Sequence, residues 1–275
     1  MKFAILMTCF NRVQTTLRCL STVYRQKLPP GVTLQVYLVD DGSTDGTGAQ
    51  VRTQFPLVEV ITGSGQLYWA KGMALAWKTA VEDGGFDAYL WLNDDVELLE
   101  NAFADILEDF VQIGRTGVLV GSCVDEAGVV CYGCRGDGGV CRKPTGQPER
   151  HLGNICGNFV FVPHEVYRKI GGMAECYHHA YGDFDYAMRL RKAGIPCFMG
   201  SKIAGVCPDH NPDEGLYSPS LRRRLKDLFL PKGRNLHDNF IYKFREGGLL
   251  RALASCLHVI YLVARGRKRW STGNH

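Results

Sequence analysis

Residues 89–98 read Tyr-Leu-Trp-Leu-Asn-Asp-Asp-Val-Glu-Leu, and this stretch decides how the 275-residue chain is interpreted. The apolar start predicts a buried strand, which ends abruptly in Asn93, Asp94 and Asp95. Carboxylates grouped at the end of a buried strand cost desolvation and mutual repulsion, so a positive charge should offset them. A hard divalent cation bound to a phosphate-bearing ligand would do so. The alternative is a helix N-cap ahead of Val96-Glu97-Leu98-Leu99.

Apolar runs alternate with helical patterns around this stretch. The predicted strands are Phe3–Thr8, Leu34–Val39, Val58–Thr62, Ala88–Leu92 and Val118–Ser122, and the predicted helices are Val13–Arg25, Thr47–Phe55, Ala70–Val81 and Asn101–Ile113. Such alternation predicts an α/β fold with a doubly wound, mostly parallel sheet of Rossmann-like type. Ligands of such sheets bind beyond the carboxyl ends of the strands.

Polar clusters follow four of these strands, which predicts a binding site at one edge of the sheet. They are Asn11-Arg12, Asp40-Asp41-Gly42-Ser43, Gly63-Ser64-Gly65 and Asn93-Asp94-Asp95. The second cluster is explained by a tight turn plus a helix cap, or by a carboxylate that accepts the imide N–H of uracil or thymine, and neither explanation excludes the other. No Gly-x-Gly-x-x-Gly follows the first strand and no Gly-Lys-Ser/Thr occurs, which disfavours dinucleotide-binding and P-loop chemistry.

The pattern loosens after residue 122. Asp125–Gln147 is rich in Gly, Cys and Pro and predicts an irregular hairpin or flap, and Asn158–Pro163 predicts a further strand. Helices are expected at Glu165–Ile170 and at Phe184–Ala193, where Gly194 and Pro196 stop the second one. The chain from Ser218 onward is basic and mostly helical in pattern.

Charge divides the chain unevenly. Residues 221–275 hold thirteen Lys/Arg and three Asp/Glu, whereas the preceding residues hold nineteen basic and twenty-five acidic groups. An acidic body with a basic tail points to an anionic surface as the partner of the tail. The N-terminus lacks the features of a signal peptide, and the best candidate span, Leu249–Val263, is short and carries Arg251 and His258.

Eleven cysteines without a secretion signal indicate a reducing cytosol and free thiols. Cys123, Cys131, Cys134 and Cys141 resemble a zinc site only loosely in their spacing. We therefore expect a Gly-rich hairpin with incidental thiols, with zinc binding as the alternative.

Four segments, in order, resemble the successive signatures of family 2 glycosyltransferases over about residues 3–210. They are Thr8-Cys9-Phe10-Asn11-Arg12, the stretch 39–47 (Val-Asp-Asp-Gly-Ser-Thr-Asp-Gly-Thr), Leu92-Asn93-Asp94-Asp95 and the stretch 181–189 (Tyr-Gly-Asp-Phe-Asp-Tyr-Ala-Met-Arg). The stretch 65–72 (Gly-Gln-Leu-Tyr-Trp-Ala-Lys-Gly) is similar to one in the rhamnosyltransferase-like branch. The resemblance implies a GT-A fold, a nucleotide-sugar donor and Mg²⁺ or Mn²⁺.

The resemblance also implies roles for individual residues. Asp95 matches the metal-binding acid of the Asp-x-Asp motif, whose first acid is replaced by Asn93; an amide oxygen can still ligate a hard cation. Asp183 matches the catalytic base, with Gly182 in place of the family's glutamate. His210 corresponds to a metal-binding histidine of some members. The residues assigned to the nucleotide sugar are Thr8, Asn11, Arg12, Asp40, Asp41, Gly65, Lys71, Asn93 and Asp94, and those assigned to the acceptor side are Glu175, His178, His179 and Asp185.

These observations lead us to expect an inverting glycosyltransferase in bacterial cell-surface polysaccharide synthesis. The donor is a UDP- or dTDP-sugar, with a slight preference for dTDP-rhamnose, and the acceptor is a glycan or a lipid-linked oligosaccharide. Two alternatives stay open: a sugar nucleotidyltransferase, and a catalytically inactive nucleotide-sugar-binding subunit, which Asn93 and Gly182 favour. Residues 1–217 would form the catalytic domain, with a nucleotide-sugar half to residue 122 and an acceptor half from residue 123.

The basic helical extension, residues 218–275, is expected to hold the protein at the inner face of the cell membrane as a cytoplasmic, peripheral protein. Its apolar positions recur at helical spacing between basic flanks, which is typical of an interfacial helix. The alternative is that this apolar stripe packs on the catalytic domain or on a second copy of the chain in a homodimer. No nucleic acid is expected as a partner.

Overall fold

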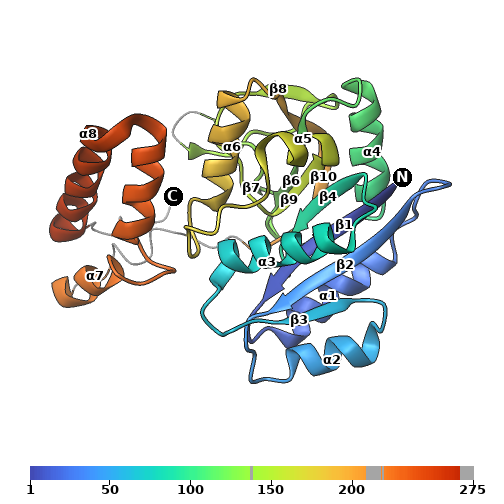
Figure 1. Cartoon of the computed structure of the whole chain (residues 1–275), viewed down its shortest axis with the longest axis horizontal. Helices are drawn as coiled ribbons and strands as arrows, with labels where there is room; N and C mark the ends of the chain where they lie inside the picture. The colour runs from blue at the N-terminus through green and yellow to red at the C-terminus, as the bar shows by residue number, and fades with distance from the viewer. Residues whose placement is uncertain (137–138, 209–217, 219, 267–275) are drawn as a thin grey trace, which may run out of the picture. The chain divides into compact units, whose positions relative to one another are not determined.

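The computed structural model describes residues 1–136, 139–208, 218 and 220–266 (Figure 1). The chain divides into two compact units, of which the first comprises Met1–Glu175 and Gly182–Asp209 and the second Cys176–Tyr181 and His210–His275. The second unit thus includes a short segment from within the predicted acceptor half. The predicted division at residues 217 and 218 stays a prediction.

The first unit is built on a mixed sheet whose strands mostly run parallel, as the sequence predicts. Along the sheet the order is β3 (Glu59–Thr62), β2 (Thr33–Asp40), β1 (Lys2–Cys9), β4 (Ala88–Leu92), β9 (Phe159–Pro163), β6 (Val118–Val124), β10 (Cys197–Val206) and β5 (Glu97–Leu98). Neighbours in the β3–β2–β1–β4 group are parallel, β9 runs antiparallel between β4 and β6, and β10 is parallel to β6. Two short strands, β7 (Val130–Tyr132) and β8 (Glu149–His151), pair with β6 and β10.

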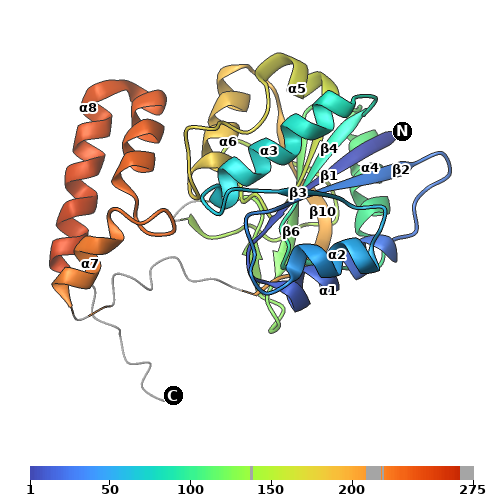
Figure 2. The same ribbon diagram turned by 60° about the horizontal axis from the view of Figure 1, so that its bottom comes forward.

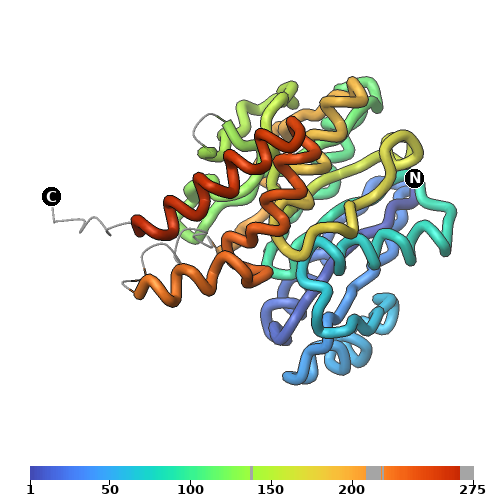
Figure 3. Tube along the Cα trace, turned by 60° about the vertical axis from the view of Figure 1, so that its left-hand side comes forward, coloured from blue at the N-terminus to red at the C-terminus, as the bar shows by residue number. Residues whose placement is uncertain are grey.

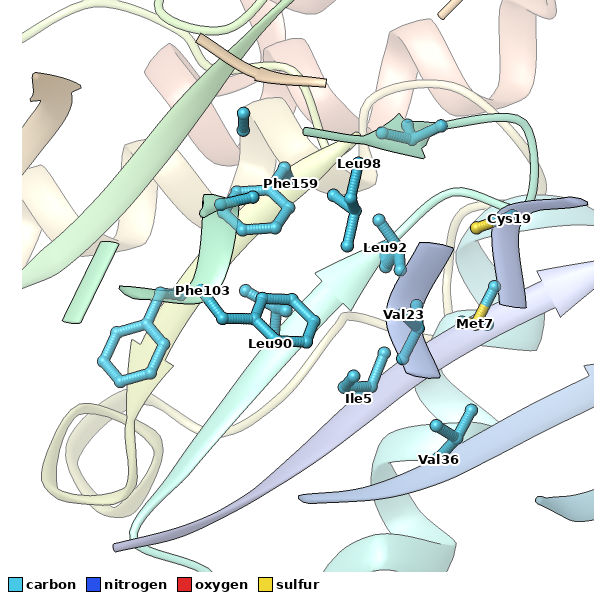
Figure 4. Packing of buried hydrophobic residues seen from close by; sticks show 14 of the residues in the cluster. Ile5, Met7, Cys19, Val23, Val36, Leu90, Leu92, Leu98, Phe103 and Phe159 are labelled. Atoms are coloured by element: carbon cyan, nitrogen blue, oxygen red, sulfur yellow. The ribbon is translucent and has the colours of Figure 1, made fainter. Parts of the chain in front are cut away.

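Helices cover both faces of this sheet (Figure 2). One face carries α1 (Val13–Tyr24), α2 (Thr47–Gln54) and α4 (Ala102–Gln112), and the other carries α3 (Tyr68–Asp83), α5 (His164–Ile170) and α6 (Gly182–Lys192). Successive residues of a strand point to opposite faces, so Ile5 packs under α1 whereas Leu6 packs under α3. Figure 4 shows the first of these cores, where Phe103 of α4 meets strand residues such as Leu90 and Phe159.

The expected N-terminal elements are all present, with ends shifted by a few residues. The helix-cap alternative for the carboxylate cluster is wrong, because the residues after Asp95 continue into the short strand β5 and not into a helix. Strand β10 has ten residues, and its register with β6 shifts between Met199 and Ile203 and between Ile203 and Gly205. The predicted flap after Asp125 contains β7 and isolated bridges that join Cys134 to Ile155 and Arg135 to Cys141.

The second unit is helical and basic. It contains α7 (Leu221–Asp227) and α8 (Leu236–Arg265), and α8 breaks at Gly247 and Gly248, whose backbone angles are not helical. The two arms of α8 lie side by side (Figures 1 and 3), and the Cys256 thiol of the second arm donates to the carbonyl of Leu236 in the first. By length and composition α8 is apolar enough to cross a membrane, although few of its apolar residues are buried. The short candidate span Leu249–Val263 lies within the second arm, after the two glycines.

Candidate functional site

The loops after β1 and β2 are joined by reciprocal hydrogen bonds. Asn11 donates its backbone N–H to Ser43 Oγ at 2.9 Å, and its side-chain oxygen accepts the N–H of Thr44 at 2.7 Å. Asn11 adopts φ = 50°, a left-handed conformation that asparagine tolerates better than most residues. The residue type at this position therefore fixes how the two loops meet at the carboxyl edge of the sheet.

Asp41 organises the third loop. Its carboxylate accepts three backbone N–H groups, those of Gly65, Leu67 and Tyr68, at 2.8–2.9 Å. Because Leu67 and Tyr68 begin α3, a side chain from the end of β2 caps that helix. A carboxylate offers about four acceptor positions, so three are spent on the loop and one is left for a ligand N–H.

The other residues assigned to the nucleotide sugar surround these loops. Asp40 accepts the N–H of Ser43 at 3.0 Å and lies against Gly48, where any side chain would collide with it. Thr8 at the end of β1 lies under Gly72 of α3 in the same way. Lys71 lies on the first turn of α3 and is partly exposed.

Arg12 is the cation that faces the carboxylate cluster. Its Nη1 atom lies 3.1 Å from Asp94 Oδ1 and 2.8 Å from Asp95 Oδ2, and both aspartates are buried. Burial raises the pKa of Asp94 to about 6, although Arg12 opposes the rise, and Thr16 donates to Asp94 Oδ2 at 3.1 Å. Arg12 thus binds both carboxylates with one nitrogen atom.

Asn93 is held away from this ion pair. Its side-chain oxygen accepts the indole N–H of Trp69 at 2.7 Å, and its backbone N–H donates to the carbonyl of Asn158. The Trp69 ring in turn packs so closely on Gly157 and Gly182 that a side chain at Gly157 would collide with it. Trp69 therefore connects the carboxylate loop to the start of α6.

The donors at this edge fit a hard divalent cation. Such cations prefer carboxylate oxygens, and Asp94 and Asp95 present them side by side. The amide oxygen of Asn93 already accepts one hydrogen bond, from Trp69. The thiol of Cys207 lies 3.5 Å from Asp95 Oδ1.

Asp183 lies at the start of α6 and keeps some solvent exposure. Its two oxygens accept the N–H groups of Phe184 at 2.8 Å and of Gly157 at 3.2 Å. Burial and the nearby Cys156 raise the pKa of Asp183 to about 7, against these hydrogen bonds and the charge of Arg135. A carboxylate with such a pKa is suited to accept a proton near neutral pH.

The guanidinium of Arg135, from the flap, and the thiol of Cys156, which follows the flap, both act on Asp183. Arg135 donates from Nε to Cys156 Sγ at 3.2 Å and lies over the Phe184 ring, with 5.8 Å from Cζ to the ring centroid. A hydrogen bond from the Cys141 thiol and the charge of Arg135 lower the pKa of the buried Cys156. The flap therefore helps to set the charge around Asp183.

Among the described residues, the four cysteines considered for zinc do not gather as a ligand group. Cys141 donates to the carbonyl of Cys131 at 3.2 Å, and Cys131 donates to that of Cys123 at 3.5 Å.

The residues assigned to the acceptor side are distributed over both units. Glu175 is exposed and is the last residue of the segment Met1–Glu175 of the first unit. Asp185 is buried and forms an ion pair with Arg189 at 2.8 Å. His178 and His179 belong to the second unit. His210, assigned as a metal ligand, lies outside the described residues.

Two residues of the site were not singled out from the sequence. Trp69 stood within the rhamnosyltransferase-like segment, where a tryptophan flanked by helical residues is more typical of a core position. Cys156 stood among eleven cysteines, and nothing in its spacing distinguishes it. The pairing of Gly157 with Gly182 becomes meaningful only when both are seen against one indole ring.

Comparisons with known proteins give a match to a family profile and a set of similar folds. The sequence profile described as glycosyl transferase family 2 matches residues 4–135, and no curated protein matches the sequence significantly. Three similar solved structures give the scale of the likeness. S. aureus TarS 1-349 is 14% identical, with 96% of this chain and 81% of that chain covered at a TM-score of 0.60. The same protein in complex with UDP-GlcNAc is 14% identical over 94% of this chain and 82% of that chain, with a TM-score of 0.58.

The mannosyltransferase PcManGT from Pyrobaculum calidifontis, in complex with GDP-Man and Mn²⁺, is 18% identical over 95% of this chain and 69% of that chain, with a TM-score of 0.57. At these identities the likeness concerns the fold, which is the GT-A fold of these solved glycosyltransferases. The family profile matches residues 4–135, slightly less than half of the chain, so this N-terminal part is similar to glycosyl transferase family 2.

Proposed function

We propose that this protein is an inverting glycosyltransferase that uses a UDP- or dTDP-sugar and in which Asp183 is the catalytic base. The observation that carries the proposal is a partly buried carboxylate with a pKa of about 7 that is connected to the carboxylate loop. The connection runs from Asp183 through Gly157 and the neighbouring Asn158 to Asn93. It joins the proposed base to the carboxylate loop that follows β4.

The residues after β1, β2 and β3 would bind the nucleoside. The remaining acceptor position of Asp41 suits the imide N–H that uracil and thymine share. Arg12 is partly exposed, so its guanidinium can move from the carboxylates to a diphosphate oxygen, an anion it binds equally well.

The chemical step needs one proton acceptor. Asp183 would take the proton of the acceptor hydroxyl as that oxygen bonds to the anomeric carbon. The bond from the anomeric carbon to the diphosphate oxygen breaks, and the nucleoside diphosphate leaves with the electron pair. Attack opposite to the leaving group inverts the anomeric centre.

Asp95, with Asp94, would hold Mg²⁺ or Mn²⁺. When bound, such a cation neutralises charge that develops on the leaving diphosphate. His210 is proposed as a further ligand on the strength of the resemblance alone.

The acceptor would be a glycan or lipid-linked oligosaccharide in bacterial cell-surface polysaccharide synthesis, with the second unit at the inner face of the membrane. The second arm of α8 supports this proposal, because one face of it is apolar and exposed. That face comprises Leu249, Leu250, Leu253, Leu257, Ile260 and Tyr261. Basic residues accompany the stripe in α7 and at Arg251 and Arg265, which suits anionic headgroups.

A donor screen tests the proposal most directly. The purified chain would be incubated with UDP, dTDP and GDP, each with and without Mn²⁺, and thermal stabilisation would rank the nucleotides. Release of nucleoside diphosphate from UDP-hexoses and dTDP-rhamnose would then be measured with and without acceptor glycans. Stabilisation by GDP alone would contradict the proposal that the nucleobase is uracil or thymine.

The same assay separates the alternatives. A sugar nucleotidyltransferase would release pyrophosphate from a nucleoside triphosphate and a sugar phosphate. An inactive subunit would bind the nucleotide sugar but release no nucleoside diphosphate with any acceptor.

A further inference from the structure

Three potential metal ligands converge within the second unit. His178 comes from the segment Cys176–Tyr181, and His237 and Asp238 come from the first turn of α8. Asp238 Oδ1 lies 2.9 Å from His178 Nδ1 and 3.0 Å from His237 Nδ1. The three donor atoms lie within 4.8 Å of one another, and no other such group occurs in the part of the chain that the structure describes.

The position of the carboxylate is fixed by its surroundings. The Asp238 side chain is fully buried, and its second oxygen accepts the backbone N–H of His178 at 2.9 Å. Asn235 caps the helix by accepting the backbone N–H of Asp238 at 3.1 Å. These bonds orient the carboxylate before any ligand arrives, as hydrogen bonds to ligating side chains do in metal sites.

The two imidazole rings complete an open arrangement. They lie 5.4 Å apart at their centroids with an angle of 65° between their planes. Both Nδ1 atoms face Asp238 Oδ1. The side chain of His178 is 29% exposed and that of His237 is 59% exposed, which leaves access from solvent.

We propose that His178, His237 and Asp238 bind a divalent cation of the zinc class, with water in the fourth position. Two imidazoles and one carboxylate are ligands that Zn²⁺ accepts at about 2.0–2.2 Å, with tetrahedral geometry. Mg²⁺ and Mn²⁺ prefer oxygen ligands, so this site and the Asp94–Asp95 edge select different cations. On binding, each Nδ1 gives up its hydrogen, which moves to Nε2 or to solvent.

The cation would tie the segment Cys176–Tyr181 to the start of α8. It would add to the hydrogen bonds that already join the two, from His178 to both Asp238 oxygens and from Asn239 to Tyr181. The site therefore has a structural role, and the proposal does not depend on the proposed function.

Cobalt binding to the full-length chain tests the proposal. The protein would be stripped with a chelator, kept reduced and titrated with Co²⁺, because Co²⁺ replaces Zn²⁺ and reports its ligands by absorbance. We expect one equivalent bound with visible bands but without intense thiolate charge-transfer bands. Zn²⁺ should displace it and raise the thermal midpoint.

The decisive variant is His237→Ala, because this side chain is the more exposed of the two and its removal leaves the bond between Asp238 and His178 intact. It should weaken Co²⁺ binding more than about a hundredfold. This exceeds the usual loss when a residue that only hydrogen-bonds to a metal ligand is removed. The matched control is His258→Ala, which removes an exposed histidine of the second arm and should bind as wild type does.

Two results would overturn the proposal. Equal Co²⁺ affinity in wild type and His237→Ala would mean that the group is a hydrogen-bonded triad only. Thiolate charge-transfer bands would mean that cysteines hold the metal. A chain with Asp95→Ala should keep its Co²⁺ site, which separates this result from failure of the proposed function.

Discussion

The pH dependence of turnover gives the sharpest test of Asp183. If this carboxylate is the base, only its ionised form is active, so kcat/KM should rise with pH through a pKa of about 7. From roughly one pH unit below that value to one above it, the ionised fraction grows from about a tenth to about nine tenths. Turnover should therefore increase about tenfold across this range. An aspartate with an ordinary pKa would be ionised throughout and would give a flat profile.

The structure also predicts how neighbouring residues shift the acid limb of the pH profile, which is the rise of kcat/KM with pH. Burial and Cys156 raise the pKa of Asp183, whereas Arg135 lowers it. Removing the thiol by Cys156→Ala should shift the acid limb to lower pH, and removing the guanidinium by Arg135→Gln should shift it to higher pH. Glu165→Gln is the matched control, because it removes an exposed acid from the first turn of α5 and should leave the profile unchanged.

The assay is release of nucleoside diphosphate at limiting donor, since kcat/KM reports the pKa of the free enzyme. Asp183→Asn should lose at least about a hundredfold in turnover, the lower end of a general base's usual contribution, and its residual rate should show no acid limb. Thermal stabilisation by the nucleotide should persist in this variant. A flat wild-type profile over this range, or an unchanged limb in Asp183→Asn, would refute the assignment.

Three further predictions concern the cation, the indole and the second unit. Asp95→Ala should weaken Mn²⁺-dependent binding of nucleoside diphosphate at least about tenfold in calorimetric titrations. If the wild-type protein binds the nucleotide equally well with and without Mn²⁺, the proposed metal site is wrong. Trp69→Phe keeps an aromatic side chain but loses the indole N–H with its 2.7 Å hydrogen bond and part of the ring packed on Gly157, so nucleotide-sugar affinity should fall about two- to tenfold. An unchanged affinity would show that the indole does not order the donor edge. Pelleting with anionic vesicles at low salt should decrease when Leu250→Glu and Leu257→Glu are combined, but not for Leu57→Glu, an equally exposed leucine of the first unit; equal pelleting of all three proteins would favour self-association or packing instead.

Much of the fold could be predicted because its signals are local. The first four strands and the helices between them follow from apolar runs and helical spacing within single segments. The polar residues that end these strands could be placed together because parallel strands end at one edge. Asn11 and Asp41 were selected on this reasoning, and both join loops at that edge in the structure.

The elements that the sequence misses depend on partners far along the chain. The two residues of β5 form a strand only because β10 offers them a ladder more than a hundred residues later. Their local pattern fitted a helix start equally well, since Asp and Asn cap helices and also end strands.

The sequence by itself determined the alternation of the first four strands with their helices, the family motifs and the residue types of the candidate site. Only the tertiary structure decided which partners those residues have: Arg12 between Asp94 and Asp95, Trp69 on Asn93, and Cys156 beside Asp183. The physical reason is that charge, burial and hydrogen bonding act through space. The pKa of Asp183 is set by groups that no spacing along the chain relates to it.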